Sequence, residues 1–92
     1  MYPTCTGVKN GRRTVGAAAI KIFQPDIAAA LVTLQADSGN TNNIFIGGAT
    51  VTMSSGIKLV PGGSIQLPIS STLELYAISD AASQQLNWMV LY

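Results

Sequence analysis

Short runs of alternating apolar and polar residues, separated by turn-forming residues, recur from about residue 30 onward and constrain the fold of this chain most. In the first run, Val32, Leu34 and Ala36 share one face, and polar residues occupy the other. A repeat of two residues is typical of a β-strand with one buried face. The polar and glycine residues of 37–42 predict a surface loop directly after this strand.

Further strands follow toward the C-terminus. They are predicted at residues 44–46, 49–54 and 64–69, with bends at Gly47-Gly48, Ser55-Gly56 and Pro61-Gly62-Gly63. Residues 57–60, between two of these bends, predict a short link or an edge strand. Pro68 has no N–H to donate, so the 64–69 strand is expected at a sheet edge or with its proline facing outward.

The last two runs, residues 73–79 and 86–92, are apolar on both faces over much of their length. One face can lie in the core of the domain. The other face of the final run carries Met89 and Leu91, and two interpretations remain open. Either this face packs against a neighbouring subunit, or the strand is simply central in a sandwich.

The N-terminal third is less regular. Its alanine runs favour helix by propensity, but Pro25 and the β-branched Ile20 and Ile22 favour a strand followed by a turn near residues 24–26. Residues 1–13 predict an extended arm or a tight hairpin. Residues 14–92 then form a single all-β domain, a small antiparallel β-sandwich or jelly-roll-like domain of six to eight short strands.

Charged residues make up only 10% of the 92 residues, against about 25% in ordinary soluble domains. This predicts that another copy or another protein covers part of the surface, the alternative being a monomer with a neutral polar coat. A net charge of +1 is too small for a general nucleic-acid binder. No apolar stretch is long enough to span a bilayer, and the first residues lack the order of a signal peptide.

Catalytic residues are scarce. The chain has no histidine, which excludes Ser/His/Asp and Cys/His arrangements, and its one cysteine, Cys5, cannot form an internal disulfide. Its four carboxylates, Asp26, Asp37, Glu74 and Asp80, are interpreted as solvated charges rather than as a glycosidase pair. We expect no enzymatic activity, no cofactor and no metal site, including a calcium site in the loop after Asp37.

Two groups of residues are candidates for contacts with other proteins. Lys9, Arg12 and Arg13 fall within five positions and are expected to contact an acidic patch, the alternative being a solvated tail. Met89, Leu91 and the terminal Tyr92 are candidates for a subunit interface. An aromatic platform of Trp88, Tyr76 and Tyr92 is a further possibility, although core packing is the favoured role of Trp88.

Four segments carry a resemblance to a known class of protein. They are NIFIGG (43–48), VT (51–52), SGIKLVPGGSI (55–65) and LYAISD (75–80). Within about residues 30–92 the chain resembles small β-sandwich structural proteins of tailed bacteriophages. The resemblance implies a capsid decoration (cement) protein, a homotrimer on the virion surface that clamps neighbouring subunits of the major capsid protein.

The resemblance implies synthesis in the host cytoplasm and a location on the capsid surface. The alternatives are a neck, tail or head-fibre component, or a carbohydrate-binding β-sandwich module. The matched region does not include the N-terminal residues, so their role as a capsid-binding arm is a separate inference. On that inference, deleting residues 1–13 weakens attachment to the shell and leaves the fold intact.

Overall fold

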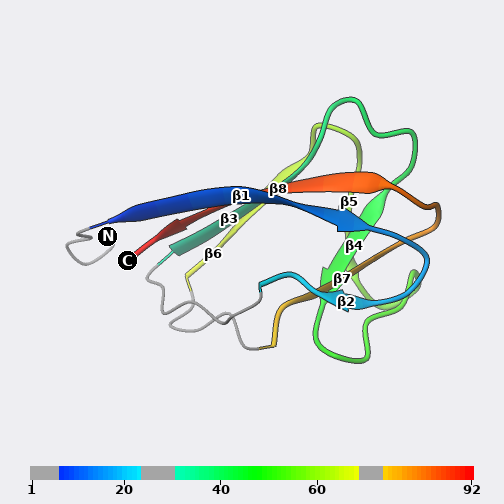
Figure 1. Cartoon of the computed structure of the whole chain (residues 1–92). Coiled ribbons are helices and arrows are strands. Elements are labelled where there is room, and N and C mark those ends of the chain that lie inside the picture. The colour runs from blue at the N-terminus through cyan, green and yellow to red at the C-terminus, as the bar shows by residue number, and fades with distance from the viewer. Residues whose placement is uncertain (1–6, 24–30, 69–73) are drawn as a thin grey trace.

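A computed structural model describes residues 7–23, 31–68 and 74–92 of the chain, and its described residues contain no helix, so none that could cross a membrane. Eight strands run through them (Figure 1): β1 Val8–Val15, β2 Ile20–Lys21, β3 Leu31–Ala36, β4 Ile44–Gly47, β5 Ile57–Leu59, β6 Ser64–Leu67, β7 Tyr76–Ser79 and β8 Gln84–Leu91.

The strands form two antiparallel four-stranded sheets, in the orders β1-β8-β3-β6 and β2-β7-β4-β5. The first strand pairs with the last, the second with the seventh, the third with the sixth and the fourth with the fifth. This nested pairing is the topology of an eight-stranded jelly roll. It confirms the predicted all-β sandwich and the upper limit of the predicted strand number.

The core lies between the sheets, and the period-two pattern of the sequence points to it. On β3, Val32, Leu34 and Ala36 are fully buried, as predicted. Across from them on β8, Leu86 and Val90 are also fully buried, and Trp88 packs partly buried against the same cluster. The aromatic rings of Phe23 and Trp88 pack edge to face, with their centroids 4.8 Å apart.

Two buried polar side chains fix the loop after β3. The amide of Gln84 accepts hydrogen bonds from the backbone N–H groups of Thr41 and Asn42, at 3.0 and 2.9 Å. Ser79 donates from its hydroxyl to the carbonyl oxygen of Asn43 at 2.7 Å. Both side chains are at least 95% buried, and each has its hydrogen-bonding partners within the chain. The predicted 37–42 loop is therefore held rigidly against β7 and β8.

The predicted strand at residues 49–54 is wrong, because this segment forms turns between β4 and β5. Val51 is 6% exposed and sits beside two glycines: a Cβ on Gly47 or on Gly56 would lie 2.7 or 2.8 Å from its Cγ2. The apolar–polar alternation of residues 49–54 therefore belongs to a loop in which Val51 is buried, and not to a strand. The strand predicted around Ile20 and Ile22 consists of β2 alone, with two residues. β7 begins at residue 76 within the predicted 73–79 run, and the predicted turn at 24–26 lies outside the described residues.

Candidate interaction surface

β1 and β8 bring together the two groups of candidate contact residues that the sequence keeps almost a chain length apart. Their antiparallel register places Lys9 opposite Val90, Arg12 opposite Asn87 and Val8 opposite Leu91. Gly7 and Tyr92 extend the ladder by exchanging both backbone hydrogen bonds, at 2.9 and 3.0 Å. The basic residues and the apolar C-terminal residues therefore belong to one surface region.

This placement corrects the predicted domain boundary at residue 13. Residues 8–13 form most of β1, which pairs with β8 over its whole length, so they belong to the sandwich. Of the two alternatives for the N-terminal residues, the hairpin does not apply to residues 8–13, because Asn10 and Gly11, its turn signal, lie within one continuous strand. Residues 1–6 of the predicted arm lie outside the described residues.

Strand alternation divides the candidate residues between two sides of the sheet. We call the side turned away from the core the outer face. It carries Arg12, Met89 and Leu91, since their neighbours in β8 and β1 face the core. The remaining three candidates, Lys9, Arg13 and Tyr92, point to the opposite side, at the rim of the sandwich. Tyr92 is thus not on the same face as the other two predicted interface residues.

One end of the outer face is apolar. Val8 is 59% exposed and Met89 is 42% exposed, and Leu91, the partner of Val8 across the ladder, is partly exposed. We call Val8, Met89 and Leu91 the apolar end. The sequence does not indicate that Val8 belongs to an apolar surface, because no apolar alternation surrounds it. Its apolar neighbours come only from the pairing of β1 with β8.

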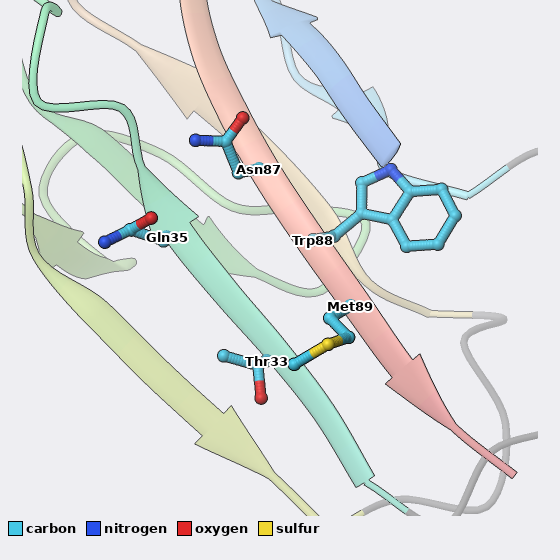
Figure 2. A pocket seen from close by; sticks show the side chains of 5 residues that line it. All are labelled: Thr33, Gln35, Asn87, Trp88 and Met89. Carbon is cyan, nitrogen blue, oxygen red and sulfur yellow. The ribbon is translucent and has the colours of Figure 1, made fainter. Parts of the chain in front are cut away.

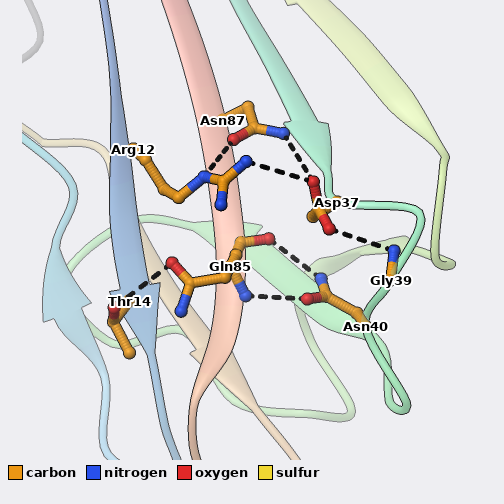
Figure 3. A network of polar contacts seen from close by, with 7 residues as sticks. All are labelled: Arg12, Thr14, Asp37, Gly39, Asn40, Gln85 and Asn87. Atoms are coloured by element: carbon orange, nitrogen blue, oxygen red, sulfur yellow. Dashed lines mark hydrogen bonds and ion pairs between the residues drawn. The ribbon is translucent and has the colours of Figure 1, made fainter.

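A polar network occupies the other end of the outer face (Figure 3). Arg12 donates through Nε to Oδ1 of Asn87 at 2.8 Å and forms an ion pair through Nη2 with Oδ1 of Asp37 at 3.3 Å. Asn87 donates to the same carboxylate oxygen at 3.3 Å. The amide of Asn40 exchanges two hydrogen bonds with the backbone of Gln85, at 2.8 and 2.9 Å. The network joins β1, β8 and the loop after β3.

The carboxylate of Asp37 is held in its ionised form by this network. The backbone N–H of Gly39, which donates to Oδ2 at 3.0 Å, is the largest influence that lowers the pKa of Asp37, followed by Asn87, with a smaller contribution from the charge of Arg12. These interactions outweigh the effect of desolvation, which acts in the opposite direction. The oxygen atoms of Asp37 and Asn40 are therefore engaged in hydrogen bonds within the protein.

Between the two ends lies a shallow hollow of about 160 Å³ (Figure 2). Thr33 and Gln35 of β3 and Asn87 and Met89 of β8 line it with outward-facing side chains. Trp88 also contributes to the lining, although its indole points away from the hollow and packs on Phe23. The volume of the hollow is below the roughly 300–1,000 Å³ of a small-molecule pocket. Hydroxyl, amide and thioether groups line it, so it offers hydrogen bonds and an apolar contact and holds no titratable side chain.

The rim of the sandwich beside β1 is basic. Lys9 places its ammonium 5.4 Å from the centre of the Tyr92 ring, a cation–π distance. Gly7 lies beneath the same ring, because a Cβ at this position would collide with it. The Nε atom of Arg13 is buried and has no hydrogen-bond partner among the described residues.

The remaining candidate residues that the structure describes do not lie together at one place. Asp37 lies in the outer-face network, while Glu74 and Asp80 are exposed and Asp26 lies outside the described residues. Within the described ranges, no three metal-ligating side chains gather. Trp88 is packed on Phe23 and Tyr76 belongs to the other sheet, so they form no aromatic platform with Tyr92.

The chain matches no model of a known family, no curated protein and no solved structure in the comparisons made with each of these three groups.

Proposed function

We propose that this protein is a non-enzymatic structural component of a virion, a capsid decoration (cement) protein that binds the outer capsid surface and stabilises coat subunits. The jelly-roll topology carries the proposal most directly, because this architecture recurs in viral capsid domains as well as in lectins and cupins. The low charge content and the exposed apolar end support a role in assembly.

In the proposed arrangement, copies of the chain associate as a homotrimer through the apolar end, and the basic β1 rim faces the major capsid protein. A rigid sandwich suits this role because a clamp must transmit load between subunits. Each copy needs to contribute only weak contacts, since a trimer engages several coat subunits at once and its avidity exceeds the affinity of any single contact.

The first test combines solution mass with binding to shells. The purified protein is measured by light scattering and then added to heads assembled without it by the virus that encodes it. We expect a mass of three times 9.6 kDa and sedimentation with the heads. Met89→Asp is expected to give a monomer with weakened binding, because it places a charge in the apolar end.

Met53→Asp is the matched control, because Met53 is 49% exposed and lies in the loop between β4 and β5, on the other sheet. It is expected to retain the parent mass and binding. A parent protein that is monomeric and does not sediment with heads would contradict the proposal.

Carbohydrate binding is the second candidate, and the hollow on the outer face favours it. Thr33, Gln35 and Asn87 supply donors and acceptors for sugar hydroxyls beside the apolar Met89. Binding of the purified protein to glycans, abolished by Gln35→Ala and accompanied by no binding to heads, would favour this alternative over the capsid proposal.

A further inference from the structure

Among the strands that the structure describes, β1 is the longest at a sheet edge. Four of these strands lie at edges: β1, β6, β2 and β5. Among them β2 has two residues, β5 three and β6 four, with Pro68 directly after β6, whereas β1 has eight. Short strands and prolines protect sheet edges from pairing with other chains. In the described part of the chain, β1 is the edge that lacks both protections.

The residue pair at the end of the β1–β8 ladder shows which β1 residues point their backbone N–H and C=O groups toward β8 and which point them away. Gly7 and Tyr92 exchange both backbone hydrogen bonds, so alternate residues from Lys9 to Val15 bond to β8 as well. The N–H and C=O groups of the intervening residues point away from the sheet. These residues are Val8, Asn10, Arg12 and Thr14, and no described residue bonds to their backbone groups.

Two β1 strands from different copies do not suit each other as partners. Opposed residues of an antiparallel pair face the same side, so the register can shift only in steps of two. The two registers with the greatest overlap are 8–14 on 8–14 and 9–15 on 9–15. The first places Lys9 opposite Arg13 twice, and the second places Arg12 opposite Arg12. Like charges directly opposite one another destabilise a strand pair.

We propose that β1 is a docking strand for an extended acidic segment of a partner protein, which joins the sheet antiparallel to β1. Lys9, Gly11 and Arg13 bond to β8, so they form the closer, non-hydrogen-bonded pairs with the added strand, with Cα atoms about 4.5 Å apart. Carboxylates on the segment would therefore face Lys9 and Arg13, four positions apart, with a residue opposite Gly11 between them. The buried Nε of Arg13 would gain the partner that it lacks among the described residues.

This inference holds for any protein that supplies such a segment, and it stands whether or not the protein decorates a capsid. Its probe is a synthetic peptide, Thr-Glu-Val-Thr-Val-Glu-Thr with blocked ends, which places a glutamate opposite Arg13 and another opposite Lys9. Backbone amide hydrogen exchange of the isotope-labelled protein is followed by NMR during titration with this peptide.

We expect the peptide to slow exchange at Val8, Asn10, Arg12 and Thr14 and to leave the alternate amides of β1 unchanged, because those are already bonded to β8. A peptide with glutamine in place of both glutamates is expected to bind about fivefold more weakly, from the loss of two cross-strand ion pairs. Arg13→Glu is expected to prefer a peptide with lysine at the facing position. Lys58→Glu, on the exposed edge strand β5, is the matched control and retains the affinity of the parent.

Two results would overturn the proposal. One is equal binding, or no binding, of the glutamate and glutamine peptides to the parent protein, a comparison that does not depend on any variant folding. The other is protection of the same four amides without peptide that rises with protein concentration, because β1 would then be occupied by a second copy.

Discussion

At the scale of single residues, Gly11 is the position where packing most clearly overrides intrinsic preference. A Cβ at residue 11 would lie 2.6 Å from Cζ2 of Trp88, whose ring packs on Phe23. Glycine weakens a strand because it is flexible and offers no side chain to pack. Here it leaves the room that the indole occupies on the inner side of β1.

We predict that Gly11→Val lowers the free energy of unfolding by about 1–3 kcal/mol, the usual cost of overpacking. Strand propensity alone predicts the opposite sign, a gain within the roughly 1 kcal/mol span of the scale. Urea unfolding followed by tryptophan fluorescence measures the difference.

Asn10→Val is the control for this change, because it adds the same side chain to the same strand on the exposed outer face. It is expected to leave stability unchanged or slightly raised. A Gly11→Val protein as stable as Asn10→Val would show that the indole can move without cost.

At the scale of elements, the conformation of the loop after β3 is determined more by hydrogen bonds with β8 than by the loop's own sequence. Gln84 accepts from the N–H groups of Thr41 and Asn42 and donates to the carbonyl oxygen of Ala82 at 3.0 Å. A buried amide with its bonds satisfied fixes one conformation, because each alternative leaves polar groups without partners.

We predict that Gln84→Met destabilises the protein by about 1–3 kcal/mol, the desolvation cost of backbone groups left without partners. Amide exchange at Thr41 and Asn42 is expected to accelerate. Gln85→Met is the control, since the side chain of Gln85 makes a single exposed bond, to Thr14 at 3.3 Å. Equal losses for the two variants would contradict the anchoring role of Gln84.

The elements differ in how well the sequence predicts them, and the reason is the range of the interactions that form them. Local periodicity and local turn chemistry predict β3, β6 and the turn at Pro61-Gly62. For β5 they leave two alternatives, a short link or an edge strand, and the structure shows an edge strand. β1 carries the turn signal Asn10-Gly11 and no apolar alternation, so only its pairing with β8 makes it a strand. The start of β8 at Gln84-Gln85 gave no signal for the same reason.

The candidate interaction surface also combines features that the local sequence predicts with features that depend on long-range pairing. Charge and hydrophobicity point to its residues one by one, and five of them fall within β1 and β8. No local pattern in the sequence indicates that the two groups are adjacent, or that alternation separates Tyr92 from Met89 and Leu91. The bond between Arg12 and Asn87 spans 75 positions, a separation that no spacing rule detects.

At the scale of the whole molecule, the nested pairing makes the first described strand part of the structural core. Val15 is fully buried, and β1 covers one flank of the central strand β8. The expectation that residues 1–13 can be removed without harm to the fold therefore has to be revised.

We predict that deletion of residues 1–13 abolishes the cooperative urea transition and the near-ultraviolet circular dichroism of Trp88, because β8 loses its neighbour along most of its length. Deletion of residues 1–6, which removes no part of β1, is the comparison. A protein without residues 1–13 that still unfolds cooperatively with the parent midpoint would contradict this prediction.

The hydrogen-bonded pair of Gly7 and Tyr92 has a mechanical consequence. A force that pulls these two positions apart acts across the β1–β8 ladder, so its bonds open one after another, as in a zipper, instead of sharing the load. A force along the strands would have to break many of them together. This sandwich therefore resists a force directed along β1 far better than a force that separates Gly7 from Tyr92.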